Sequence, residues 1–152
     1  MGLKIGICGA AGGFSQAFIP LFQAHPGVDE VYLAEIMADR LAEQAAKFGV
    51  TKTFSSLDEL CKSDCDCIAL FTQRWMHGPQ AVQALKAGKH VYSAVPAAVS
   101  LEELDELVKT VKETGLTYML GETSYYRAQT TFCRNAFATG KFGEFVYGEG
   151  QY

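Results

Sequence analysis

Short apolar runs alternate along the chain with segments in which apolar residues recur every three or four positions. The apolar runs, of which 65–72 (CDCIALFT) is the clearest, are typical of strands buried on both faces of a parallel sheet. The segments between them have the spacing of amphipathic helices. The pattern predicts strands at 3–8, 30–35, 65–72, 89–93, 116–120 and 144–152, helices at 14–25, 39–49, 77–88, 100–115 and 126–140, and a short strand followed by a short helix within 52–61.

Residues that begin and end helices stand at the expected places. The pattern S-x-x-E, which starts at Ser56 and again at Ser100, has the form of a capping box. Gly49 and Gly115 follow the last periodic residues of two helices, where a left-handed residue is common. Pro20 lies inside the 14–25 segment, so this helix is expected to be kinked or shortened there.

The regular alternation of strand and helix predicts an α/β fold, with a doubly wound parallel sheet of the Rossmann type and right-handed crossovers. No internal repeat, low-complexity run or linker interrupts it. The expected last strand, 144–152, has no helix after it, and an uncovered apolar edge is a liability. We therefore expect the chain to be the front part of a longer protein, or another subunit to cover this strand.

Composition and charge narrow the function. The chain has 152 residues, of which 49% are hydrophobic and 20% charged, which suits one domain with a real core. The net charge is −4 and no basic patch stands out, which argues against a nucleic-acid partner. No stretch approaches the roughly 18 apolar residues that a membrane span needs, and the N-terminus does not have the form of a signal peptide.

Five cysteines, an odd number, are spread over the chain, and three of them cluster at Cys61, Cys65 and Cys67. The spacing C-x3-C-x-C matches no common zinc site and no histidine is near in sequence, so we interpret the cluster as structural rather than metal-binding. A secreted disulfide scaffold would be shorter and richer in cysteine. Free thiols in a reducing cytoplasm are the expectation.

A glycine-rich turn, GAAGGFS at 9–15, joins the first strand to the first helix, which is the context that a dinucleotide fingerprint requires. Gly9 suits the tight turn after the strand, while Gly12 and Gly13 let the backbone approach a pyrophosphate. Ala11 and Phe14 stand where G-x-G-x-x-G has glycines, so the variant G-x-x-G-x-x-S fits better. The alternative is a glycine turn with a structural role alone.

Glu35 ends the second expected strand, 26 residues after Gly9 (35 − 9). An acid at this point accepts hydrogen bonds from the adenosine ribose and repels a 2′-phosphate, so it favours NAD over NADP. Arg40 is the one nearby residue that could weaken this preference. Alone, Glu35 could equally be a solvated strand end.

Two segments carry a family resemblance. One is CIALFTQRWMHGPQAVQALKAGKHVY at 67–92, within which ALKAGKHV is close to the family's ALEAGKHV, and the other is ATGKFGEFVYGEGQY at 138–152. With them the chain resembles the Gfo/Idh/MocA family, which includes glucose–fructose oxidoreductase and inositol 2-dehydrogenase. Thr72 and His77 match the family pattern, whereas Gln73 stands where proline is usual. Ala94-Val95-Pro96 replaces the family's Glu-Lys-Pro.

The resemblance implies a dinucleotide-binding domain over 1–122, followed over 123–152 by a hinge helix and the first strand of an α/β C-terminal domain that is otherwise absent. It implies an NAD-dependent oxidoreductase that acts on a sugar, a cyclitol or a related polyol, and a homo-oligomer formed through the C-terminal domain. Because half of the cleft is missing, the chain alone is expected to be inactive.

The departures from Glu-Lys-Pro change the expected mechanism. Val95 cannot orient a hydroxyl or relay its proton as the family's lysine does, and Ala94 removes that lysine's partner. The two losses are coherent because a buried charge without its partner is costly. Proton transfer then falls to His77, to Tyr126 or to the C-terminal domain, where the resemblance often places the acid–base residues. His77 could instead cap a helix, and Tyr126 could pack between domains. The residues expected to face the cofactor are Gly9, Ala11, Gly12, Gly13, Phe14, Glu35, Thr72, Gln73, Arg74, His77, Ala94, Pro96 and Glu122.

Two other functions stay open beside the oxidoreductase. One is an enzyme of the same fold that uses NAD without net redox, such as an eliminating glycosidase or an epimerase. The other is a non-catalytic dinucleotide-binding regulator, which the loss of the Glu-Lys pair favours.

Overall fold

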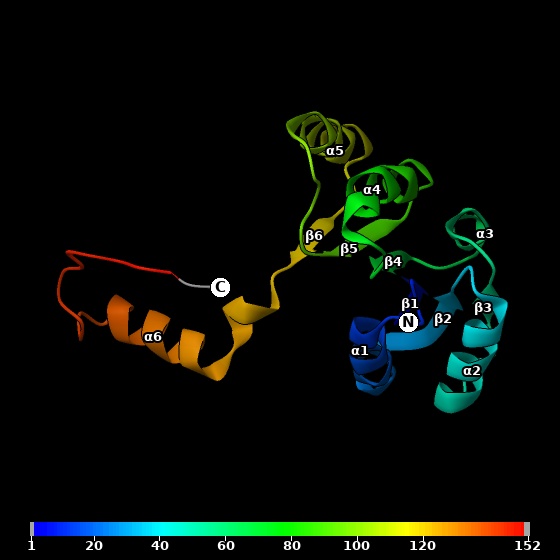
Figure 1. Ribbon diagram of the computed structural model, residues 1–152, viewed down its shortest axis with the longest axis horizontal. Helices are drawn as coiled ribbons and strands as arrows, with labels where there is room; N and C mark the ends of the chain where they lie inside the picture. The colour runs from blue at the N-terminus through cyan, green and yellow to red at the C-terminus, as the bar shows by residue number, and fades with distance from the viewer. Residues whose placement is uncertain (1, 151–152) are drawn as a thin grey trace. The chain divides into compact units, whose positions relative to one another are not determined.

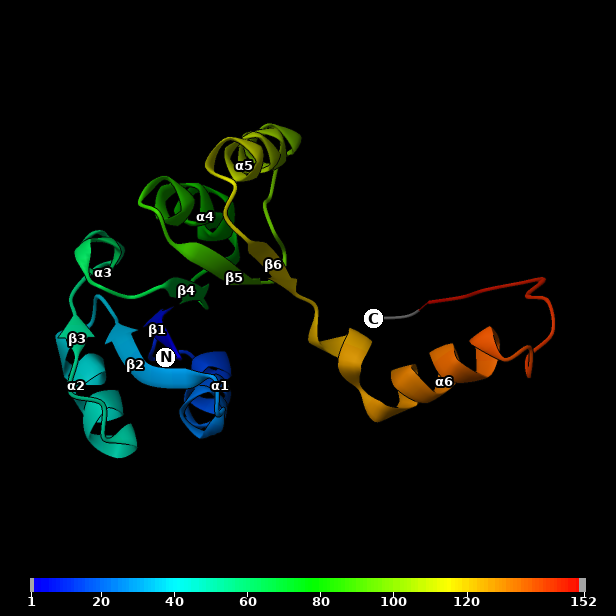
Figure 2. The same ribbon diagram turned by 180° about the vertical axis from the view of Figure 1, so that it is seen from behind.

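A computed structural model describes residues 2–150 of the chain. Two compact units make up this part, one that ends at Gly121 and one that begins at Glu122. The first unit contains a parallel six-stranded sheet in the order β3-β2-β1-β4-β5-β6, which confirms the predicted Rossmann-type α/β fold (Figures 1 and 2). The strands are β1 (Leu3–Cys8), β2 (Val28–Ala34), β3 (Thr53–Phe54), β4 (Cys67–Leu70), β5 (His90–Ala94) and β6 (Tyr118–Gly121).

The helices follow the predicted periodic segments closely. The Ser56 and Ser100 hydroxyls accept hydrogen bonds from the amides of Glu59 and Glu103, at 3.2 Å in each case. The helices are α1 (Gly13–Ala24), α2 (Ala38–Phe48), α3 (Leu57–Lys62), α4 (His77–Lys86), α5 (Leu101–Thr114) and, in the second unit, α6 (Ala128–Ala138), with single turns η1 (Arg74–Met76) and η2 (Thr123–Tyr126).

Of the two effects expected of Pro20, shortening does not occur, because α1 continues through it from Gly13 to Ala24. The proline lies on the exposed side of the helix. Water can therefore satisfy the carbonyl group that loses its amide partner there.

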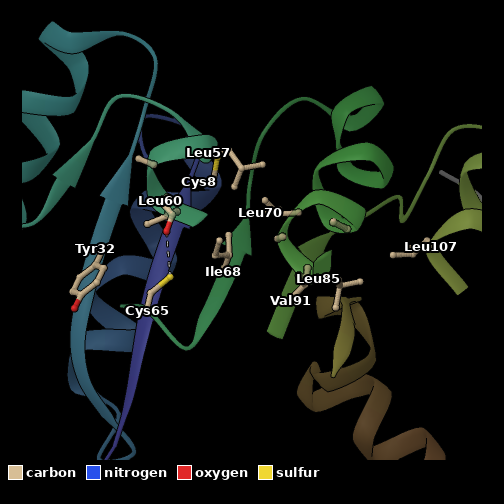
Figure 3. Close-up of a cluster of buried hydrophobic side chains, with 13 residues drawn as sticks. Cys8, Tyr32, Leu57, Leu60, Cys65, Ile68, Leu70, Leu85, Val91 and Leu107 are labelled. Carbon is tan, nitrogen blue, oxygen red and sulfur yellow. Dashed lines mark hydrogen bonds between the residues drawn. The ribbon is translucent and has the colours of Figure 1, made fainter. Parts of the chain in front are cut away.

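Helices cover the sheet on both faces (Figure 1). Residues along β1, β2, β4 and β5 alternate between two hydrophobic clusters. In β2, Tyr32 and Ala34 pack toward α3, α4 and α5, whereas Val31 and Leu33 pack toward α1 and α2. Figure 3 shows the first cluster, which joins the strands to Leu60 of α3, Leu85 of α4 and Leu107 of α5. This two-sided burial explains why the strands read as nearly continuous apolar runs.

All the strands end at the same edge of the sheet, here called the carboxyl edge. It comprises the 9–15 loop after β1, Glu35 after β2, residues 72–74 after β4 and residues 94–96 at the end of β5. β1 is hydrogen-bonded to β2 on one side and to β4 on the other. The strand order therefore reverses between β1 and β4, and doubly wound folds bind ligands at this reversal.

The strand expected at 144–152 is not formed in the part of it that the structure describes. Residues 144–150 have no regular secondary structure and are exposed, and residues 151–152 lie outside the described residues. A strand needs a neighbour to accept and donate its backbone hydrogen bonds, and no strand of residues 2–150 pairs with this segment. The apolar pattern of the segment alone was not enough to predict its conformation.

A network of charged groups lies near the amino ends of β1 and β4. Lys4 is paired with Asp64, and the Tyr32 hydroxyl donates toward Asp64 and Glu30 at 2.9 Å. Lys52 lies 3.0 Å from Glu30 and 2.8 Å from the Tyr32 hydroxyl. The Lys4 ammonium, followed by the Tyr32 hydroxyl, lowers the pKa of Asp64 from 3.8 to about 2.

This shift predicts a pH-dependent contribution to stability. The unfolded chain protonates Asp64 at about pH 4 but the folded chain only at about pH 2, so its contribution is complete above about pH 4 and is lost between about pH 4 and 2. Asp64→Asn should therefore lower the urea midpoint at about pH 6 and make no difference near pH 2. Asp105→Asn, on the exposed face of α5, is the control. An equal effect of Asp64→Asn at both pH values would contradict this prediction.

Candidate functional site

Gly9 is required by the fold itself. Its φ is 81°, a conformation that side chains other than that of glycine rarely adopt. A Cβ atom at this position would lie 2.8 Å from the carbonyl carbon and oxygen of Phe71 and 2.9 Å from the amide nitrogen of Thr72. The turn after β1 thus rests directly on the backbone that leaves β4.

Gly12 and Gly13 are different, because nothing in the described chain requires them to be glycine. Neither has a positive φ. A Cβ atom on Gly13 would meet no atom within 4 Å, and one on Gly12 would come no closer than 3.5 Å to another atom. The space beside Gly13 is open, whereas a Cβ on Gly12 would make only ordinary van der Waals contacts. A ligand can therefore approach the backbone at Gly13, where a side chain would stand.

The N-terminus of α1, which begins at Gly13, lacks the usual groups that satisfy a helix start. No side chain caps it and its first turn contains no acidic residue, whereas α3 and α5 each have a serine cap and two acids. The amide groups of the first turn have no partner within the helix and carry a partial positive charge. This end of α1 suits the phosphate groups of a nucleotide.

Ser15 fixes the shape of the glycine loop, although sequence reasoning did not single it out. It is fully buried, and its hydroxyl lies 2.7 Å from the Gly12 carbonyl oxygen and 2.9 Å from that of Ala10. The final serine of the G-x-x-G-x-x-S pattern was the available signal. Phe14, beside it, is 59% exposed and stacks on Phe18 of the same helix.

Glu35 lies beside this loop, as its place at the end of β2 predicted. One carboxylate oxygen accepts a hydrogen bond of 3.2 Å from the amide of Ala11, and the other accepts one of 3.3 Å from the amide of Met37. The side chain is half-buried, so it also remains accessible to a ligand. A carboxylate in this position can accept hydrogen bonds from the ribose hydroxyls of a nucleotide whose phosphates contact α1.

His77 connects the ends of β4 and β5. Its ring is 2% exposed at the start of α4, with Nδ1 2.8 Å from the carbonyl oxygen of Pro96 and Nε2 3.0 Å from that of Thr72. The Thr72 hydroxyl is bonded to Gln80 of the same helix. Both nitrogens of His77 thus face the backbone, which leaves neither free for a substrate.

The segment where the family carries Glu-Lys-Pro is open and uncharged. Val95 is 46% exposed, Ala94 is half-buried, and the Val95–Pro96 peptide bond is cis. Gln73 and Arg74 are also exposed, and Arg74 makes no ion pair within residues 2–150. Arg74 is thus the one free cation that the described residues place at the end of β4.

Glu122 and Tyr126 belong to the second unit and have local contacts there. The Glu122 carboxylate accepts a 2.9 Å hydrogen bond from the amide of Ser124 and so caps η2. Tyr126 is 65% exposed, and its ring lies edge-on to that of Tyr125 at a centroid distance of 5.0 Å. Its hydroxyl is available to a reacting group.

The cysteine cluster lies away from the carboxyl edge. Burial is the main cause that raises the pKa of Cys61 to about 11 and that of Cys67 to about 12, so both thiols stay protonated. The Cys65 thiol contacts the carbonyl of Leu60 (Figure 3). Across residues 2–150 no group of three or more His, Cys, Asp or Glu residues is placed to hold a metal ion. Cys133, on α6, is exposed.

Separate parts of the carboxyl edge therefore suit separate groups of a dinucleotide. The open backbone at Gly13, at an uncapped helix start, suits the pyrophosphate, and Glu35 on the β2 side suits the adenosine ribose. The ends of β4 and β5, on the other side of the strand reversal, would then hold the nicotinamide half. These features define an NAD-binding Rossmann domain.

Comparisons with known proteins agree with this class. Residues 3–122 match the profile of the oxidoreductase family with an NAD-binding Rossmann fold. Over 140 residues the chain is 31% identical to 4-carboxy-2-hydroxymuconate-6-semialdehyde dehydrogenase of Sphingobium sp., a match that covers 91% of this chain and 44% of that protein. Over 118 residues it is 33% identical to a glycosyl hydrolase family 109 protein of Shewanella amazonensis, covering 78% and 26% of the two chains.

Among solved structures, the WlbA dehydrogenase from Bordetella pertussis in complex with NADH and UDP-GlcNAcA superposes with a TM-score of 0.86 at 26% identity, covering 94% of this chain and 44% of that one. The chain belongs to the Gfo/Idh/MocA family of oxidoreductases. It spans less than half the length of each of these relatives. No helix in residues 2–150 is both long and apolar enough to cross a membrane.

The two kinds of glycine predict opposite outcomes of substitution by alanine. Gly9→Ala should lower the free energy of unfolding by about 1–3 kcal/mol because of its left-handed backbone. Gly13→Ala should leave stability unchanged or raise it by about 0.4–1 kcal/mol, because the alanine restricts the unfolded chain. The same Gly13→Ala change should weaken NADH binding roughly tenfold or more, equivalent to about 1.4 kcal/mol.

Urea unfolding and calorimetric titration with NADH measure the two effects separately. Normal NADH binding by the folded Gly13→Ala variant would show that the open space beside α1 is not the pyrophosphate site.

Proposed function

We propose that the chain is the dinucleotide-binding part of an NAD-dependent oxidoreductase that acts on a sugar, a cyclitol or a related polyol. The observation that carries the proposal is the open backbone at Gly13, at an uncapped helix start, beside the carboxylate of Glu35. The solved relative with NADH and UDP-GlcNAcA supports a carbohydrate-like substrate, and the Sphingobium relative is likewise named a dehydrogenase.

In this proposal NAD supplies the hydride acceptor, and the chain binds and orients it. The first-turn amides of α1 hold the pyrophosphate, and Glu35 accepts hydrogen bonds from the adenosine ribose. Glu35 would repel the 2′-phosphate of NADP, so we propose NAD as the cofactor. Thr72 and Pro96 shape the surface beneath the nicotinamide, and Val95 adds an apolar, uncharged side chain there.

The proton of the reacting hydroxyl requires a group other than the lysine that the family places at position 95. His77 has both nitrogens at backbone carbonyls, so we assign it no proton transfer. Within the chain, Tyr126 is the candidate, because its hydroxyl is exposed and its residue follows the last strand. In the longer protein, loss of turnover with unchanged NADH binding in the Tyr126→Phe variant would support this assignment. Unchanged turnover in that variant would refute it.

We also propose the arrangement of the whole protein. Residues 123–152 form the hinge helix and the start of a C-terminal domain, which joins copies into a homo-oligomer. All five cysteines are free, as in a protein of the reducing cytoplasm. Light scattering of a longer form of the protein would test the oligomer, and a monomer would refute it.

The charge of Glu35 predicts cofactor preference. The chain should bind NADH, even if weakly, and bind NADPH at least about tenfold less tightly. Glu35→Ala should weaken NADH binding by about tenfold and reduce the difference between the two cofactors. Glu43→Ala on the exposed face of α2 is the matched control. Ligand-observed NMR titration detects such weak binding, and a wild-type chain that binds neither dinucleotide would refute the proposed function.

A second function has support from the glycosyl hydrolase family 109 relative. An enzyme of this kind uses NAD without net redox. Incubation of the longer protein with NAD and a 4-nitrophenyl glycoside would then release 4-nitrophenol without accumulation of NADH. Steady formation of NADH from a free polyol, without glycoside cleavage, would favour the oxidoreductase instead.

A further inference from the structure

One buried side chain connects the ends of two neighbouring strands, β4 and β5. His77 lies within hydrogen-bond distance of Pro96 O, which follows β5, and of Thr72 O, which follows β4. The Thr72 amide in turn lies 2.9 Å from the place that a Cβ on Gly9 would occupy, so the same backbone touches the turn after β1. The ring is therefore the only side chain among residues 2–150 that is shown bonded to both the β4 and the β5 ends of the carboxyl edge.

The contacts of His77 are those of a structural link between two loops rather than of a catalytic acid or base. The ring is 2% exposed, and each nitrogen faces a main-chain carbonyl oxygen. A neutral imidazole donates to one of these oxygens and a protonated one donates to both. In either state the ring fills the space between the two loops, and a proton given to a substrate would have to leave a nitrogen that already faces the backbone.

We propose that His77 is a positioning residue, which holds the β4 and β5 loops at the separation that the nicotinamide half of the cofactor requires. The inference rests on the proposed function. Under this proposal, binding of the nicotinamide half depends on His77, whereas binding of the adenosine and pyrophosphate half does not. Glu35 and the start of α1, on the other side of the strand reversal, hold that second half.

Comparing the affinities for NADH and ADP-ribose distinguishes a positioning role of His77 from a general loss of stability. His77→Ala should weaken NADH binding by about 10- to 100-fold, the range expected when a binding surface is misplaced by about 1 Å. It should leave the affinity for ADP-ribose unchanged, since that ligand lacks nicotinamide. His90→Ala is the control, because His90 accepts a 2.9 Å hydrogen bond from the Thr117 amide at the opposite end of β5. Equal losses for both ligands, or no loss for either, would overturn the proposal.

Conservative variants test the two bonds one at a time. An asparagine amide nitrogen lies near the position of Nδ1, so His77→Asn keeps the bond to Pro96, whereas the longer His77→Gln reaches toward Thr72 as Nε2 does. Hydrogen exchange should therefore speed up in residues 72–76 of the asparagine variant and in residues 94–98 of the glutamine variant. Each variant should recover part of the NADH affinity that alanine loses. Identical exchange in all three variants would overturn the proposal.

The same design separates this inference from the proposed function. A wild-type chain that binds ADP-ribose and NADH equally well would overturn the positioning role while leaving dinucleotide binding intact. A wild-type chain that binds neither ligand would refute the proposed function, and the exchange data would still decide whether His77 braces the two loops.

Discussion

The candidate site depends on a close approach between Gly9 and the Phe71–Thr72 peptide. A Cβ at Gly9 would lie 2.8 Å from that backbone, so only a hydrogen atom fits there. The approach sets where β1 and β4 diverge, which is where the order of strands reverses. It thereby places the start of α1 at the carboxyl edge and the Thr72 carbonyl within reach of the His77 ring.

The two edges of the sheet differ in how their charges are arranged. At the amino ends, Lys4 and Lys52 are balanced by Asp64 and Glu30 in a paired network. At the carboxyl edge the described charges, Glu35 and Arg74, lie far apart in sequence and have no ion partner within residues 2–150. Unpaired charges in a sparsely charged surface have the larger influence on a charged ligand. The charges of the amino edge are thus paired with one another, whereas Glu35 and Arg74 at the carboxyl edge remain unpaired within residues 2–150.

Much of the fold was predictable from local sequence patterns. The contacts of His77 and the conformation of residues 144–150 were not, because both depend on residues distant in the sequence. Buried strands and capped helices were predicted because each depends on neighbours in sequence, as at Ser56 and Ser100, and Glu35 was placed correctly because parallel strands end at one edge. The contacts of His77 were not predictable, because Pro96 is 19 residues away in the chain. The strand at 144–150 failed to form because pairing requires a partner that periodicity cannot reveal.

The distribution of the five thiols has a practical consequence. Cys8 and Cys65 are buried, Cys61 and Cys67 are partly covered, and only Cys133 is exposed. Burial also raises the pKa values of the first four, which keeps them unreactive toward alkylating reagents at neutral pH. The natural sequence thus offers a single attachment point for a fluorophore or spin label, on α6 of the second unit. A label there would report the motion of that unit relative to the sheet without any cysteine being removed.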